Sequence, residues 1–190
     1  MQHKTKYLGI LFTGLLFMLV VLQAQSQDQT LLNEDNIGMS FPELEAETLS
    51  GKDVLFPDSV AGKITLLLIA FERDTQSKID SWLNPFIQVY GDSTFIDFYE
   101  IPMISTGWKL IAPIIDGGMR SGVPQARHDH VSTYYGRLSS YKEKLGMNDK
   151  SECYLFLLDS RGHIQWQSTG SFSRQDFNQL QAKIMSLKHD

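Results

Sequence analysis

The apolar run from Ile64 to Phe71 is the feature that most constrains the fold of this chain. Its eight residues read Ile-Thr-Leu-Leu-Leu-Ile-Ala-Phe, with no alternation between apolar and polar positions. A strand that faces water on one side alternates, whereas a strand covered on both faces is apolar almost throughout. The run therefore predicts a central strand with a layer of structure on each of its faces.

Strand and helix patterns alternate along the chain around this central strand. Apolar residues at spacings of three and four predict helices, and short runs of β-branched and aromatic residues predict strands. Gly146 is expected to close one helix, Ser173 to cap the last one, and Pro85 to kink the helix that contains it. The predicted helices are 77–90, 138–145 and 177–187, with 106–115 a helix or extended arm that ends near Gly117-Gly118, and the predicted strands are 41–45, 53–56, 64–71, 95–101, 131–135, 154–158 and 163–167.

These elements predict an α/β fold, a three-layer domain in which helices flank a central mixed sheet. The chain of 190 residues suits a single domain. The last two strands flank Asp159-Ser160-Arg161-Gly162, a turn with glycine at the left-handed position, and so predict a β-hairpin. We expect residues 1–26 to be a signal peptide, 27–39 a linker and 40–190 the domain.

The first 26 residues have the pattern of a secretory signal peptide. Lys4 and Lys6 precede an uncharged apolar run of 15 residues, 8–22, and Ala24 and Ser26 stand where small residues precede cleavage. As a helix the run spans about 22 Å, less than the roughly 30 Å of a bilayer core. We expect a secreted or periplasmic protein. An uncleaved N-terminal anchor and a mitochondrial presequence are the alternatives.

Charge and cysteine content exclude several classes of function. The net charge is −5 and becomes −7 without residues 1–26, which argues against a nucleic-acid partner. The single cysteine, Cys153, excludes an internal disulfide, a CxxC redox pair and a cysteine-rich zinc site. Because Cys153 adjoins an apolar strand, we expect it to be buried and inert, and its use in redox chemistry is the alternative.

The order of elements resembles extracytoplasmic thioredoxin-like proteins over residues 40–188. The resemblance rests on Leu49-x-Gly51-Lys52 and Ala61-Gly62-Lys63-Ile64 before the apolar strand, and on the closing hairpin and helix. It implies that a CxxC would fall at about Gln76 and Ile79, and a cis-proline near Cys153. This chain carries neither motif, so the thioredoxin-like domain is expected to be redox-inactive.

The segment 154–170 also resembles a family of thioredoxin-like proteins without CxxC, the mitochondrial ATPase complex subunit ten family. These are assembly factors of the ATP synthase membrane sector. The residues that match the family pattern are Tyr154, Phe156, Leu157, Asp159, Gly162, Ile164, Trp166 and Gly170. Gln165 departs from it, since the family tends to carry arginine there. The resemblance implies a chaperone-like protein that binds a protein partner, such as a membrane complex, without cofactor or chemistry of its own.

Candidate binding residues lie in three segments. Glu72, Arg73, Asp74 and Gln76 follow the central strand, where a catalytic loop of this fold would lie, and form either a polar recognition rim or a solvated charge cluster. Arg120 follows Gly117-Gly118 in a loop that either cradles an anion or simply ends a helix. Trp108 is a candidate for an exposed contact, whereas Trp82 and Trp166 fall on apolar patterns and are assigned to the core.

His128 and His130 are candidate metal ligands, because residues two apart on a strand share a face. No third ligand follows at metal spacing, so a solvated loop is the alternative and no metal is expected. The sequence favours a non-catalytic binding or assembly protein that acts near a membrane outside the cytoplasm. The alternative is a divergent extracytoplasmic thiol-disulfide oxidoreductase or peroxiredoxin-like protein that uses Cys153. The oligomeric state is left open.

Overall fold

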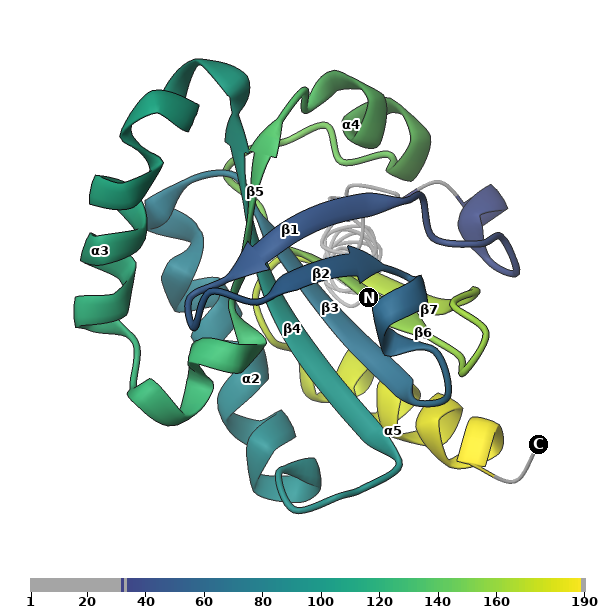
Figure 1. Ribbon diagram of the computed structural model, residues 1–190. Coiled ribbons are helices and arrows are strands. Elements are labelled where there is room, and N and C mark those ends of the chain that lie inside the picture. The colour runs from purple at the N-terminus through teal and green to yellow at the C-terminus, as the bar shows by residue number, and fades with distance from the viewer. Residues whose placement is uncertain (1–31, 33, 189–190) are drawn as a thin grey trace, which may run out of the picture. The chain divides into compact units, whose positions relative to one another are not determined.

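The computed structural model describes residue 32 and residues 34–188, which fold around one mixed β-sheet (Figure 1). The predicted signal peptide lies outside the described residues, as do residues 27–31 and 33 of the predicted linker. The elements in chain order are η1 (Glu34–Asn36), β1 (Leu44–Thr48), β2 (Asp53–Phe56), η2 (Asp58–Val60), β3 (Ile64–Ala70), η3 (Arg73–Thr75), α2 (Gln76–Tyr90), β4 (Ile96–Ser105), η4 (Thr106–Ile111), α3 (Ala112–Gly122), η5 (Gln125–His130), β5 (Ser132–Gly136), α4 (Ser139–Leu145), β6 (Tyr154–Leu158), β7 (Ile164–Thr169) and α5 (Arg174–Lys188).

The sheet has the strand order β2-β1-β5-β4-β3-β6-β7, with β3 between β4 and β6. β3 is parallel to β4 and antiparallel to β6, and β4 is parallel to β5. A strand that continues in parallel needs a crossover, and α2 supplies the one between β3 and β4. The predicted α/β fold with a central mixed sheet is confirmed.

The core lies on both faces of β3, as its unbroken apolar sequence predicts. Leu66 and Leu68 pack with apolar residues of α2 and α5, among them Trp82, Phe86 and Leu180. On the opposite face, residues such as Leu67 and Ile69 pack with apolar residues of β1, β2, β6 and α4. The ring of Trp82 meets that of Trp166 edge-on at 6.0 Å, so the assignment of both tryptophans to the core is confirmed.

The turn between β6 and β7 is held by the carboxylate of Asp159. Its Oδ1 accepts the backbone N–H groups of Arg161 and His163, each at 2.9 Å. Its Oδ2 accepts the side-chain amide of Gln165 at 3.0 Å. Gly162 has φ +81°, and a Cβ added there would lie 2.4 Å from Pro57 Cβ, so both the backbone and the space require glycine. The predicted hairpin is confirmed, and the amide of Gln165, at the position that departs from the family pattern, donates to Asp159.

Two segments differ from the sequence-based expectation. Gly117-Gly118 does not end a helix, because α3 continues through both glycines to Gly122. Glycine costs a helix about 1 kcal/mol per residue, and two long-range hydrogen bonds offset part of that cost: Tyr135 to Asp116, and Arg120 to the Leu49 carbonyl. The segment with His128 and His130 is also not a strand but the 3-10 helix η5.

The ends of other elements agree with the local signals. Gly146 closes α4 with φ +73°, and Ser173 Oγ accepts the backbone N–H of Asp176 at 3.0 Å, as a helix cap does. α2 is one helix that includes Pro85. Residues 36–39 also contact the domain: Asn36 donates to Leu145 O at 3.1 Å, and the N–H of Gly38 donates to Ile164 O at 2.7 Å.

The three hydrogen bonds accepted by the Asp159 carboxylate, here called the Asp159 clamp, predict a specific loss of stability. We expect Asp159→Ala to lower the free energy of unfolding by about 2 kcal/mol, because two backbone N–H groups and one amide lose a charged acceptor. Urea denaturation monitored by circular dichroism measures the loss. Asp92→Ala, which removes an exposed carboxylate, is the control and should leave the stability unchanged. An equal effect of the two variants would contradict the clamp.

Candidate functional site

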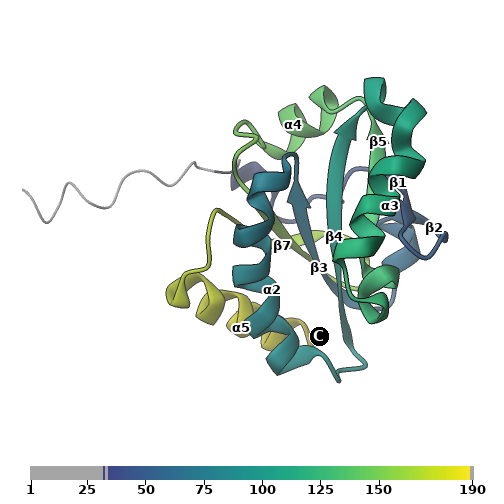
Figure 2. The ribbon, with the colours of Figure 1, turned by 90° about the vertical axis from the view of Figure 1, so that its left-hand side faces the viewer.

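The carboxyl ends of β3 and β4 lie at the same edge of the sheet, because the two strands are parallel. β3 leads into η3 and α2, and β4 leads into η4 and α3 (Figure 2). In open α/β sheets, ligands bind outside the carboxyl ends of the strands. This edge is therefore the candidate functional site, and it contains the predicted residues from Glu72 to Gln76 together with Trp108.

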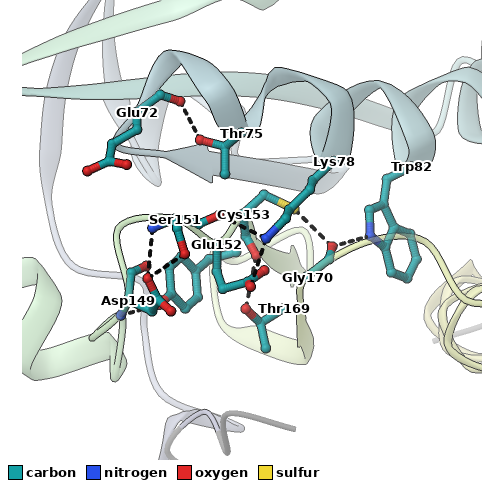
Figure 3. Close-up of polar contacts among 11 residues, drawn as sticks. Glu72, Thr75, Lys78, Trp82, Asp149, Ser151, Glu152, Cys153, Thr169 and Gly170 are labelled. Carbon is teal, nitrogen blue, oxygen red and sulfur yellow. Dashed lines mark hydrogen bonds and ion pairs between the residues drawn. The ribbon is translucent and has the colours of Figure 1, made fainter. Parts of the chain in front are cut away.

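The segment after β3 presents charged side chains to solvent. Glu72, Arg73 and Asp74 are exposed, whereas Thr75 is buried and its hydroxyl donates to the Glu72 carbonyl (Figure 3). The exposed Gln76 begins α2 and donates to Asp80 at 3.2 Å. The structure thus brings the four predicted rim residues together on one turn. Their role in binding stays a prediction.

Cys153 lies beneath this segment and is fully buried, as expected from its apolar neighbours. Its thiol donates to the carbonyl oxygen of Gly170 at 3.1 Å, and Trp82 Nε1 donates to the same oxygen at 2.9 Å (Figure 3). Burial, and next the nearby carboxylate of Glu152, raise the pKa of the thiol to about 12. A thiol that is buried and stays uncharged is a poor nucleophile.

An ion pair joins α2 to the loop before β6 next to Cys153. Lys78 Nζ lies 2.7 Å from Glu152 Oε1 and donates to the Ser151 carbonyl at 2.9 Å (Figure 3). The second carboxylate oxygen of Glu152 is buried without a hydrogen-bond partner among the described residues. Sequence reasoning did not find this pair, because its members are 74 positions apart and each sits in an ordinary polar context.

A second pair joins the buried Glu100 of β4 to the half-buried Arg127 of η5. Glu100 is 4% exposed, and its Oε2 lies 3.2 Å from Arg127 Nη2. Burial raises the pKa of Glu100, although Arg127 and the side chain of Gln76 act in the opposite direction. Arg127 Nε and Thr133 Oγ1 are buried without partners in the described part of the chain. Glu100 thus connects η5 to the start of α2. The sequence signal that could have found this pair is the charged residue Glu100 within a predicted strand.

The predicted metal ligands do not point to a common centre. His128 Nε2 pairs with the Val123 carbonyl at 2.9 Å, while His130 Nδ1 lies 3.1 Å from the Phe98 carbonyl and 3.2 Å from Asp97 Oδ1. The His130 ring also stacks on Phe98 at 4.5 Å. The expectation that both rings share one face of a strand is wrong. Within residues 34–188, no cluster of three potential ligands is found.

Arg120 and Trp108 lie on other elements than the charged turn, Arg120 on α3 and Trp108 on η4. Arg120 Nε donates to the Leu49 carbonyl at 2.6 Å from within α3, so the predicted anion-binding loop is absent from this segment. Trp108, a candidate for an exposed contact, is 55% exposed on η4, and Leu110, Ile111 and Ile114 beside it are also exposed. Three of these four residues were not singled out from the sequence, although their helical spacing was visible there.

Comparisons with known proteins agree with the fold and identify a family. The family described as "ATP10 protein" matches residues 31–187. A relative from Candida glabrata, "Mitochondrial ATPase complex subunit ATP10", is 25% identical over 164 residues, which cover 79% of this chain and 57% of the relative. The match thus spans little more than half of that curated relative.

Solved structures of similar shape have low sequence identity and show the fold alone. BsSco, of the Sco family of cytochrome c oxidase assembly proteins, has a TM-score of 0.55 at 13% identity, covering 81% of this chain and 96% of that one. Yeast Sco1 with copper bound has a TM-score of 0.52 at 15% identity, covering 82% and 95%. A thioredoxin family protein from Chlorobium tepidum has a TM-score of 0.51 at 15% identity, covering 79% and 97%.

The burial of Cys153 predicts a thiol that does not react in the folded chain. With a pKa of about 12, about one thiol in ten thousand is ionised at pH 8. We expect Ellman's reagent to leave the native protein unmodified and to titrate one thiol per chain in denaturant. Rapid labelling of the native protein would contradict the buried position.

The pair of His130 and Asp97 predicts a change of stability with pH. The hydrogen bond that His130 donates to the Asp97 carboxylate raises the pKa of His130 above its usual value near 6.5. The contribution of the His130–Asp97 pair to the free energy of unfolding is therefore complete below that value. It is lost as the pH rises through the raised pKa. We expect the stability difference between wild type and His130→Gln, at most about 1 kcal/mol, to shrink from about pH 6 to pH 9. Urea denaturation across this range measures it. His128→Gln is the control, and a difference independent of pH would contradict the assignment.

Proposed function

The chain belongs to the ATP10 family, and from this premise we propose that it is a non-catalytic assembly factor. It binds a protein partner that belongs to a membrane complex and holds it during assembly. The name of the Candida glabrata relative points to an ATPase complex as the class of partner. Recognition then depends on exposed side chains at the edge of the sheet, without covalent chemistry.

The observation that carries this proposal is that no cysteine stands at the N-terminus of α2. Thiol oxidoreductases of this fold place a reactive thiol there, because the helix dipole stabilises a thiolate. Here Gln76 begins the helix, and Ile79 three residues later is fully buried. The one thiol of the chain is buried against Gly170 with its pKa raised to about 12. These features favour binding over thiol exchange.

The exposed turn of Glu72, Arg73 and Asp74 is the proposed recognition rim. Its three charged side chains stand at the edge where ligands of α/β sheets bind. The buried threonine that follows, and the bonds of Gln76 to Asp80 and Glu100, fix the turn to α2 and β4. A charged rim on a rigid support suits recognition of a protein surface.

We place the protein outside the cytoplasm, at a membrane. The support is the pattern of residues 1–26, in which two lysines precede an apolar run and small residues. That segment lies outside the described residues. Among residues 34–188, no helix is both long and apolar enough to cross a bilayer. The domain therefore reaches a membrane complex either through its own surface or through the N-terminal segment.

Capture of partners from native membranes tests the proposal. We expect the tagged chain, cross-linked in its own cells, to recover subunits of the membrane part of ATP synthase, identified by mass spectrometry. The triple variant Glu72→Ala, Arg73→Ala, Asp74→Ala should recover about tenfold less, because the rim loses its charges while the fold keeps its contacts. Glu143→Ala, Lys144→Ala removes exposed charges of α4 and is the matched control.

Two further measurements separate this function from thiol chemistry. The purified chain should reduce insulin disulfides no faster than background, and Cys153→Ser should recover the same partners as wild type. Enzyme-like reduction, or a mixed disulfide between Cys153 and a partner, would replace the proposed function with the redox alternative. Recovery of unrelated proteins would contradict the proposed partner and leave the fold assignment unchanged.

A further inference from the structure

The segment formed by η4 and α3 exposes four large apolar side chains within seven residues. They are Trp108, Leu110, Ile111 and Ile114, exposed by 55%, 94%, 39% and 74%. We call this set the α3 apolar stripe. Isolated exposed apolar residues are ordinary, but a contiguous group marks a contact site. The stripe begins at the carboxyl end of β4, on the same sheet edge as the charged rim.

Two hydrogen bonds fix the rotation of α3 and so direct the stripe outward. Asp116 accepts the hydroxyl of Tyr135 at 2.8 Å, and Arg120 donates to the Leu49 carbonyl at 2.6 Å. These residues are four apart and share one side of the helix, which faces the sheet. Since each residue turns a helix by about 100°, Ile114 lies on the opposite side. Figure 1 shows α3 at the margin of the fold.

The fold does not bury the apolar side chains of the stripe. No residue of η4 or α3 is fully buried, and the half-buried apolar residues of α3 are Ala112, Ile115 and Met119, none of which belongs to the stripe. Full burial of a leucine or isoleucine side chain is worth about 1.5–3 kcal/mol. That stabilisation is available to whatever covers the stripe.

We propose that the α3 apolar stripe inserts into the interfacial region of a lipid bilayer. Four partly exposed side chains offer about half of the roughly 800 Å² that each subunit buries in a stable dimer. Leu110, almost fully exposed, projects as an inserting side chain does. Trp108 is the residue type favoured at the boundary between headgroups and acyl chains. Lys109 is the one charged residue in 106–115, so this segment is cationic although the whole chain is acidic.

The apolar run before the domain is a second membrane contact in the alternative in which it is not cleaved. Eleven residues, 23–33, separate the apolar run 8–22 from η1 at Glu34 and span at most about 40 Å. If the run stays in the bilayer, it holds the domain within reach of the lipid surface. One weak contact rarely anchors a protein, and two together do. The proposal rests on the proposed function for the location at a membrane, but it needs no partner protein.

Tryptophan fluorescence of the full chain tests the insertion locally. Trp82 and Trp166 are buried, so Trp108 is the tryptophan that acyl chains can reach. The probe is a vesicle of phosphatidylcholine and phosphatidylglycerol in equal parts, with brominated acyl chains. We expect quenching and a blue shift of Trp108 emission, absent in Trp108→Phe. The double variant Leu110→Ser, Ile114→Ser should lose the quenching while circular dichroism shows the native fold.

The controls separate the stripe from other contacts. Val89→Ser removes an exposed apolar residue of α2 and should keep full quenching. Because residues 1–31 contain no tryptophan, binding through that segment alone leaves the emission unquenched. Wild-type chain that floats with vesicles without quenching would overturn the proposal. The proposal would also be overturned if Trp108 emission shifted to the blue on addition of a purified partner protein without detergent, and not on addition of vesicles. That result would assign the stripe to a protein contact. Neither result alters the partner-capture test of the proposed function.

Discussion

Burial of β3 between two apolar layers is the constraint on which the rest of the structure depends. Its four central residues, Leu66 to Ile69, are fully buried, and each contributes about 1.5–3 kcal/mol of hydrophobic stabilisation. A strand covered on both faces needs helices on one side and further apolar structure on the other. Its parallel neighbour β4 is reached through a crossover helix, which here is α2. The chain therefore leaves the core at the carboxyl ends of β3 and β4, and both candidate surfaces lie at that edge.

The same edge carries reactive thiols in oxidoreductases of this fold, and here it carries none. Gln76 begins α2, while Lys78 and Glu152 form an ion pair beside the buried Cys153. A dithiol site needs exposed sulfur and a lowered thiol pKa. Burial of Cys153 removes the first and reverses the second. The proposed contacts at this edge are instead made by the side chains of the charged rim and of the α3 apolar stripe.

Features encoded by local sequence were predictable, and features set by distant contacts were not. The hairpin clamp of Asp159, the left-handed Gly146 and the cap at Ser173 each depend on residues within a few positions. The course of α3 through Gly117-Gly118 depends instead on Tyr135 and Leu49, which lie on β5 and after β1. Glycine propensity therefore predicted a loop where tertiary hydrogen bonds support a helix. The geometry of His130 likewise follows from Asp97 and Phe98, about 30 positions away.

The sequence by itself determined the central strand, the closing hairpin and the lack of a CxxC pair, because periodicity, turn residues and cysteine count are local properties. Its closing segment also pointed to the family that the comparisons identify. Only the tertiary structure decided that the thiol of Cys153 is enclosed, that Glu100 is paired inside the domain, and that Ile111 and Ile114 face outward. Each of these depends on which residues from distant segments meet, since packing sets both the solvent access of a side chain and the rotation of a helix.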